Sequence, residues 1–108
     1  MEKEQKIDFL AIGDIVIDAF IKLKDANVHC NIDHENCELC VKFGDKIPYE
    51  YATIIAAVGN SPNAAISAAR LGLHAGLVTN IGNDEYGAQC LEVLKKEKIN
   101  TNYVTKED

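Results

Sequence analysis

The chain has 108 residues, and its 11 Lys plus Arg against 17 Asp plus Glu give a formal net charge of −6. Apolar residues make up 47% and charged residues 26% of the sequence. These are ordinary globular values, which exclude a disordered tail, a collagen-like fibre and a coiled coil. The length allows one small domain. The acidic balance argues against a nucleic-acid or anionic-membrane partner, because both require a basic face.

The charge is distributed unevenly along the chain. From Ala52 to Gly82 the only formal charge is Arg70. A free-standing domain of this size has a large surface to cover with polar groups. The neutral segment therefore predicts that this part of the chain lies inside a larger fold.

The N-terminal segment does not resemble a targeting signal. The apolar run that follows the charged start is interrupted by Asp8, Asp14 and Asp18, so no secretory core forms. No stretch approaches the roughly 18 apolar residues of a membrane span. We predict a cytoplasmic protein with no membrane partner. In that compartment the four cysteines are expected as thiols or metal ligands rather than disulfides.

The first elements in chain order are strands. Phe9–Ile12 is a continuous apolar run, and Ile15–Ile17 continues it after a Gly-Asp pair, which is typical of a strand buried on both faces. The polar stretch from 22 to 50 follows, and within it Val41–Ile47 alternates before Pro48. We expect short antiparallel strands there, outside the main sheet.

A helix is predicted next. Ser61 is a good N-cap, Pro62 fits the first helical position, and Gly72 lies just past the expected end. The body between them is apolar on nearly every side, which predicts a helix buried all round.

The remaining elements alternate between strand and helix. Ala75–Ile81 is predicted as a core strand, and Asn83 or Asp84 can cap a second helix that places Cys90 in the core. Asn102–Thr105 begins a third strand. This alternation indicates an α/β fold with a mainly parallel sheet.

The loop Gly59-Asn60-Ser61-Pro62-Asn63 is the first candidate site. Free N–H groups at a helix N-terminus attract oxygen-rich ligands, and the Asn63 amide can both donate and accept, which suits sugar hydroxyls. The alternative is an ordinary cap and turn. No Gly-x-Gly-x-x-Gly follows the first strand and no Gly-Lys-Ser/Thr is present, so a stand-alone nucleotide-binding domain is not supported.

Asp14 and Asp18 form a second candidate, because open α/β sheets bind ligands at the carboxyl ends of their strands. The alternative for Asp14 is a turn or surface residue. Asp18 interrupts an otherwise apolar segment, which favours a role in binding.

The third candidate is Cys30-x-x-x-His34-x-x-Cys37-x-x-Cys40. Three thiols and an imidazole are a donor set that zinc prefers, and His29 could replace His34. The alternative is that the thiols are partly buried in a small sheet.

Three ordered blocks together resemble the PfkB, or ribokinase-like, carbohydrate kinase family. The first, residues 11–18, is similar to the family's opening strand, with Gly13 followed five places later by Asp18. The second, residues 59–72, is similar to a Gly-Gly-x-x-x-Asn helix start and an Ala-rich helix ending in Leu-Gly, with Val58 in place of the first glycine. The third, residues 78–87, is similar to a Gly-x-Asp-x-x-Gly turn.

This resemblance implies a ribokinase-like, Rossmann-like sheet with helices on both faces and a small β lid. Residues 1–21 and 52–108 would form the N-terminal part of the α/β domain, and 22–51 the lid insert. Zinc, if bound by the cysteines, would stiffen this lid, and the lid could also pair two copies into a homodimer.

The resemblance also implies a sugar-binding side. Asp18 would accept hydrogen bonds from sugar hydroxyls, Gly59 would let the substrate approach the backbone, and Asn63 would bind another hydroxyl. Asn60 would lie between them and face the same pocket. Asp14 remains a candidate binding residue from its position at the end of the first strand.

The family's general base and ATP site belong to C-terminal segments that this sequence does not contain. The chain is therefore expected to be the N-terminal part of an ATP- and Mg²⁺-dependent sugar or nucleoside kinase, inactive alone. The alternative is a small binding module held together by zinc, without catalysis.

Overall fold

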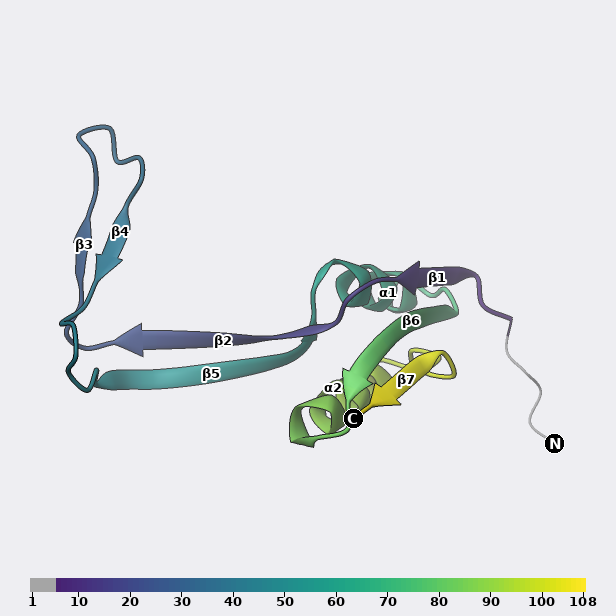
Figure 1. Cartoon of the computed structure of the whole chain (residues 1–108). Coiled ribbons are helices and arrows are strands. Elements are labelled where there is room, and N and C mark those ends of the chain that lie inside the picture. The colour runs from purple at the N-terminus through teal and green to yellow at the C-terminus, as the bar shows by residue number, and fades with distance from the viewer. Residues whose placement is uncertain (1–5) are drawn as a thin grey trace. The chain divides into compact units, whose positions relative to one another are not determined.

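The computed structural model describes residues 6–108, so the charged start at residues 1–5 lies outside the described residues. The elements follow one another as strands and helices along the chain (Figure 1), and their bounds are β1 (Phe9–Ile12), β2 (Val16–Leu23), β3 (Asn27–His29), β4 (Glu38–Cys40), β5 (Tyr49–Val58), α1 (Asn60–Arg70), β6 (Ala75–Gly82), α2 (Glu85–Lys96) and β7 (Val104–Glu107).

The main sheet is parallel and has the order β1-β6-β7. Phe9 pairs with Ala75 at one end of the β1–β6 ladder, and Thr79 pairs with Val104 at the start of the β6–β7 ladder. β6 lies between its two neighbours (Figure 1) and is buried over most of its length. Alternating strands and helices with parallel pairing confirm the predicted α/β fold class.

One hydrophobic core joins this sheet to both helices. Its largest fully buried aliphatic side chains are Leu77 on β6 and Leu94 on α2. Ala65 and Ala68 of α1 and Cys90 of α2 lie in the same cluster. The prediction that Cys90 is a core residue is confirmed, because its side chain is buried.

Helix α1 differs from the sequence prediction in two ways. It begins one residue after Gly59, so Ser61 lies inside the first turn and is not the cap. Its buried residues are Pro62, Ala65 and Ala68, which form one stripe, so the helix is not buried all round. Alanine is small enough to be left exposed on the other side at little cost. The predicted end is confirmed, since the N–H of Gly72 donates to the Ala69 carbonyl.

Helix α2 begins as predicted at Asp84. The Asp84 carboxylate accepts a hydrogen bond of 2.8 Å from the backbone N–H of Gly87, which satisfies one of the unpaired donors of the first turn. Asn83, the other predicted cap, instead donates its side-chain amide to Asp108. Lys95 and Lys96 lie in the last turn, where cations favour the helix dipole.

Residues 19–54 form a compact unit of their own. β2 pairs with β5, and β3 pairs antiparallel with β4, so the predicted short antiparallel strands are present. The alternating segment Val41–Ile47 is a loop with turns rather than a strand. Every residue of this unit is exposed or half-buried, because two-stranded ribbons have no second layer to cover their faces.

No helix within residues 6–108 is long and apolar enough to cross a membrane.

Candidate functional site

The first turn of α1 is the centre of the candidate site. Gly59 is the N-cap and has a φ of 114°, a backbone conformation that favours glycine. No side chain caps the helix. Because Pro62 has no N–H and the N–H of Asn63 donates to the Gly59 carbonyl, the backbone donors left at this end are those of Asn60 and Ser61.

The two asparagines of this turn share one face of the helix. Asn60 and Asn63 are three residues apart and both are exposed, so their amides are neighbours. Together they offer two donors and two acceptors beside the free backbone N–H groups. This combination recognises hydroxyl groups, which also both donate and accept.

A hydrogen bond fastens the loop after β1 to the same turn. The Ser61 hydroxyl donates to the Asp14 carbonyl at 2.8 Å. A Cβ added at Gly59 would lie 3.3 Å from the same Asp14 oxygen, so the two backbones are close. The structure thus brings the backbone of Asp14 to the start of α1. The sequence analysis missed this role of Ser61, since no local signal points to a carbonyl 47 residues away.

Asp18 lies on the same face of β2 as Val16, the residue of this strand that lies beside Gly59. Val16 Cγ2 would lie 3.6 Å from a Cβ at Gly59. Side chains two residues apart in a strand share a face, so Asp18 lies on the same face as Val16. Ile15 and Ile17, on the other face, pack against the core. This alternation explains why a carboxylate is tolerated within an apolar segment.

The substitution of valine for the family's first glycine causes no backbone strain at that position. Val58 is not among the described non-glycine residues with positive φ, whereas Ala57 is, with a φ of 60°. A buried alanine therefore adopts the unusual conformation one residue earlier. The valine can remain extended and half-buried.

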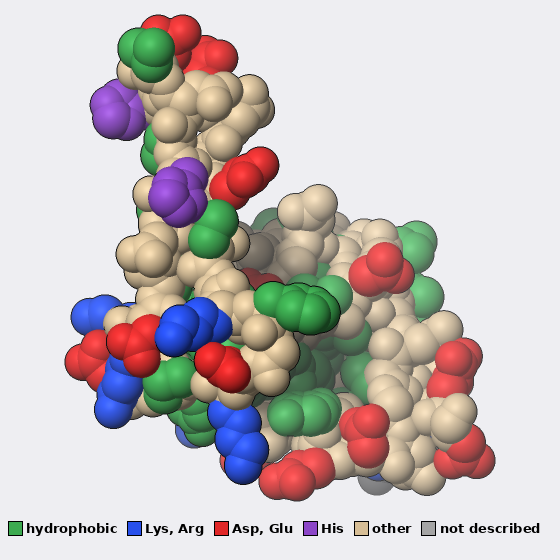
Figure 2. Space-filling model, turned by 60° about the vertical axis from the view of Figure 1, so that its left-hand side comes forward, with side chains coloured by type: hydrophobic (Ala, Val, Ile, Leu, Met, Phe, Trp, Pro, Cys, Tyr) green, Lys and Arg blue, Asp and Glu red, His purple; other side chains and the backbone are tan. Residues whose placement is uncertain are grey.

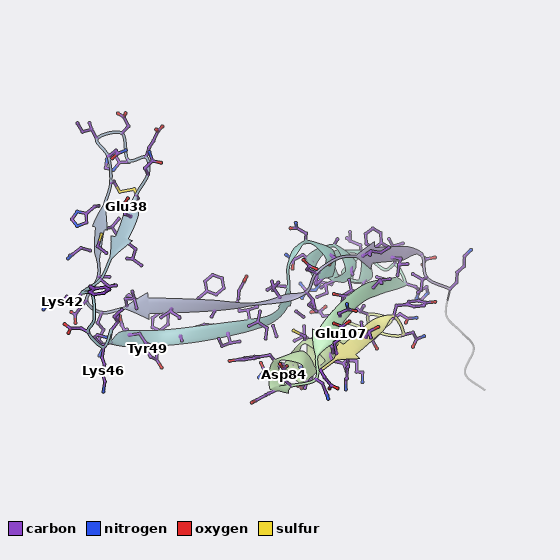
Figure 3. All side chains as sticks on the ribbon, viewed as in Figure 1. Glu38, Lys42, Lys46, Tyr49, Asp84 and Glu107 are labelled. Atoms are coloured by element: carbon purple, nitrogen blue, oxygen red, sulfur yellow. A yellow bond between two sulfur atoms is a disulfide. The ribbon has the colours of Figure 1, made fainter. Side chains whose placement is uncertain are left out.

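The third block is a structural turn. A Cβ at Gly87 would lie 1.9 Å from the Gly82 carbonyl oxygen, so only glycine fits. Figure 3 shows Asp84 at the start of α2, where its carboxylate caps the helix. These residues border a cavity of about 160 Å³ that is also lined by Ile17, Asn80 and Tyr86.

The cysteines are arranged differently from the prediction. Cys30 and Cys37 form a disulfide, while Cys40 and Cys90 are free. Within residues 6–108 no group of three or more His, Cys, Asp and Glu side chains is placed to hold a metal ion. The β3–β4 register explains the pairing. Asn27 lies opposite Cys40 and His29 opposite Glu38, so the next pair along is Cys30 and Cys37.

The zinc set is also divided by the strand geometry. Cys40 pairs with Asn27 at the far end of the β3–β4 ladder. It is three residue pairs from the disulfide, which is roughly 10 Å of strand. The expectation of thiols or metal ligands is therefore not met by Cys30 and Cys37, and His34 has no thiolate partner set to join.

Away from this site, the ion pair between Arg70 and Glu97 shifts the pKa values of both side chains. Arg70 Nε donates to Glu97 Oε2 at 3.0 Å. This hydrogen bond, with the attraction between the charges, lowers the pKa of Glu97 below its ordinary value and raises the pKa of Arg70. Both groups lie at the ends of helices, so the pair joins α1 to α2.

Comparison with known families gives one match over most of the chain. The model described as "pfkB family carbohydrate kinase" matches residues 22–108. This range includes the unit at 19–54 almost entirely, as well as α1, β6, α2 and β7.

Two curated relatives are kinases of small sugar-like molecules. The 5-dehydro-2-deoxygluconokinase of Geobacillus thermodenitrificans is 29% identical over 104 residues, which is 95% of this chain and 25% of that protein. The fructosamine kinase FrlD of Bacillus subtilis is 44% identical over 46 residues, 43% of this chain and 16% of that protein. The chain thus spans about a quarter of the length of the first relative and less of the second.

A solved structure agrees with this assignment. The ribokinase of Cryptococcus neoformans var. grubii, in complex with ADP, superposes with a TM-score of 0.67 at 26% identity, covering 91% of this chain and 26% of that one.

Proposed function

Because this chain belongs to the pfkB family of carbohydrate kinases, we propose that it is the N-terminal part of an ATP-dependent kinase that phosphorylates a hydroxyl of a sugar or nucleoside. The observation that carries this proposal is the junction of the β1–β2 loop with the first turn of α1, tied by the hydrogen bond from Ser61 to Asp14. The exposed amides of Asn60 and Asn63 lie at this junction beside the free backbone N–H groups of the first turn, and we propose that the carboxylates of Asp14 and Asp18 complete the site.

Each group has a role that its chemistry supports. The Asp18 carboxylate accepts hydrogen bonds from two neighbouring hydroxyls, which fixes the sugar's orientation. The Asn63 and Asn60 amides donate to and accept from further hydroxyls. Gly59 lets the sugar approach the backbone, since it has no side chain. Asp14 lines the edge of the pocket. Phosphoryl transfer depends mainly on such positioning.

The segment 22–51 is proposed as a lid over the sugar, with the remaining residues 1–21 and 52–108 as part of the α/β domain. A lid excludes water, which would otherwise compete with the sugar hydroxyl as the phosphoryl acceptor. Exposed strand edges and apolar side chains in this segment, such as Tyr49 and Tyr51, would also suit pairing of two lids in a homodimer.

ATP supplies the phosphoryl group, and Mg²⁺ would accompany it in the complete enzyme. The described residues contain no glycine-rich phosphate loop of the Gly-Lys-Ser/Thr kind, so we assign none of them to ATP. The short coverage of the relatives supports the proposal that the general base and ATP site lie in other segments. The chain of 108 residues is then inactive alone, and sugar-dependent ATP turnover by it would contradict this.

Two finer proposals remain from the sequence. Zinc binding by Cys30, His34, Cys37 and Cys40 applies only to a reduced form, since two of these residues are bonded here. The alternative function, a small zinc-held module without catalysis, is not favoured, because the family match includes the cysteine segment and the α/β elements alike. Zinc analysis with a polyol-binding assay distinguishes the two functions.

The decisive experiment measures kcat and KM for sugars and nucleosides in the complete kinase that contains this chain. We expect Asp18→Asn to lower kcat/KM for the preferred substrate by about 10²-fold or more, with the KM for ATP little changed, because an oriented hydrogen-bond acceptor is lost. Asn63→Ala should raise the KM for the sugar.

Two matched controls are available in the same chain. Ser67→Ala lies one turn after Asn63 on the same exposed side of α1, and Glu92→Gln removes an exposed carboxylate on α2. Both should leave the kinetic constants within about twofold. If the controls and the site variants behave alike, these residues do not bind the sugar.

A further inference from the structure

The tip of the β3–β4 hairpin contains a chemical group that the kinase proposal does not use. The disulfide Cys30–Cys37 joins its two arms, as the yellow bond in Figure 3 shows. The register places these two residues directly opposite each other, one step beyond the His29–Glu38 pair. The strand pairing therefore brings the two cysteines together in the geometry in which the bond forms.

The hairpin has little else to hold it together. Each arm contributes three paired residues, and Val28 and Leu39, its cross-strand apolar pair, are each 64% exposed. Figure 2 shows histidine and acidic side chains on its surface. An isolated two-stranded ribbon without a buried face is only marginally stable, so the disulfide is its main constraint.

The turn between the cysteines is strained as well. His34 and Asn36 have positive φ values of 56° and 51°, a conformation that non-glycine residues adopt at some cost. Two backbone hydrogen bonds, from Asn31 to Glu35 and from His34 to Asn31, close the turn. The two hydrogen bonds and the disulfide together hold the turn in this conformation.

Both bonded cysteines are exposed, whereas Cys40 is half-buried. Cys40 pairs with Asn27, three residue pairs along the hairpin from the disulfide, which is roughly 10 Å of strand, so it cannot attack the disulfide while this register holds. Exchange must therefore involve an external thiol. A soluble dithiol reaches the sulfur atoms without any unfolding of the α/β elements.

We propose that the tip is a reversible thiol–disulfide exchange site, in which the redox state of Cys30 and Cys37 decides whether residues 27–40 are ordered. A thiolate of a dithiol reductant attacks one sulfur, forms a mixed disulfide and releases the other cysteine as a thiolate. The second thiol of the reductant then displaces the remaining cysteine. The protein disulfide gains two electrons and two protons, and the dithiol becomes a disulfide. This inference concerns the tip alone and does not depend on the kinase proposal.

The test combines thiol counting with amide hydrogen exchange on the full chain, using dithiothreitol as reductant and oxidised glutathione as oxidant. Of the four cysteines, Cys40 and Cys90 should be alkylated in the oxidised, denatured protein, and all of them after reduction. Exchange in residues 27–40 should accelerate by up to about 50-fold on reduction, as expected for opening a short disulfide loop. The α/β elements should not change.

Variants separate this inference from its competitors. Cys30→Ser and Cys37→Ser should exchange as the reduced protein does under both conditions, and Cys40→Ser, the matched control, should behave as the wild type. The inference is overturned if all four thiols stay free with oxidised glutathione. It is also overturned if exchange is the same in both states, or if stoichiometric Zn²⁺ occupies the cysteines and prevents their oxidation.

Discussion

The α/β unit, described over residues 6–18 and 55–108, and the ribbon unit, residues 19–54, use the same types of apolar side chain in opposite ways. In the α/β unit, Leu77 and Leu94 are fully buried. In the other unit, Leu39 is 64% and Phe43 fully exposed. This difference in burial arises because a sheet covered by helices has an interior, whereas a two-stranded ribbon has no second layer to cover it. The ribbon unit, residues 19–54, must therefore be stabilised mainly by strand hydrogen bonds and the disulfide.

The largest expected effect tests this contrast directly. Leu77→Ala should lower the free energy of unfolding by about 2–5 kcal/mol, because it leaves a cavity in the core. The matched Leu39→Ala removes the same atoms from an exposed site and should cost less than about 1 kcal/mol. Urea denaturation measures both. Equal losses would show that the ribbon unit has a buried face after all.

A smaller effect is expected at the start of α2. Asp84→Ala removes the acceptor of the Gly87 N–H and should cost about 1 kcal/mol, as loss of an N-cap does. Asn83→Ala, at the adjacent position, loses only an exposed contact with Asp108. Its effect should stay within about 0.5 kcal/mol. A larger loss at Asn83 than at Asp84 in thermal unfolding would contradict the cap assignment.

The smallest effect concerns pH. The pKa of Glu97 is lowered by Arg70, so the pair stabilises the fold above the ordinary carboxylate pKa of about 4.3. That contribution is lost as the pH falls through the lowered value. Glu97→Gln should differ from the wild type at neutral pH and converge with it in acid.

Added salt should also reduce this difference, because the pair is exposed to solvent. The matching substitution in the ribbon unit is Glu50→Gln, which removes the exposed ion pair with Lys22 and is compared with Glu97→Gln in the same measurement. A difference between Glu97→Gln and wild type that grows in acid would be inconsistent with the assigned sign.

Local signals predicted the α/β unit well. The apolar runs predicted the strands β1 and β6, Gly72 the end of α1, and Asp84 the cap of α2, because each depends on residues within one turn or one strand. The prediction that the first strand is buried on both faces was wrong, since only Ala11 of β1 is buried in the described structure. The predicted start of α1 was wrong, because Gly59 and not Ser61 is the N-cap. The Ser61 hydroxyl instead donates to the Asp14 carbonyl, 47 residues away. Sequence spacing cannot show such a competitor.

The ribbon unit was predicted less well for the same reason. Val41–Ile47 alternates like a strand but has no partner in the described residues. The link between Cys30 and Cys37 depends on the hairpin register, which the spacing alone left open. Asp18 and the loop with Asn60 and Asn63 were candidates from the local pattern, and the family resemblance added a sugar-binding role for each. These binding roles remain predictions for the kinetic experiments above.

The β1–β6 ladder has a consequence for how the chain folds. Phe9 pairs with Ala75, with the whole ribbon unit between them in sequence, whereas β6 and β7 are separated only by α2. Closing the longer loop costs more chain entropy and brings no reward until it is complete. We therefore expect β6, α2 and β7 to assemble first and β1 to join last. The side of the proposed sugar site that contains Asp14 would then form only in the final step, although β1 precedes these elements in the chain.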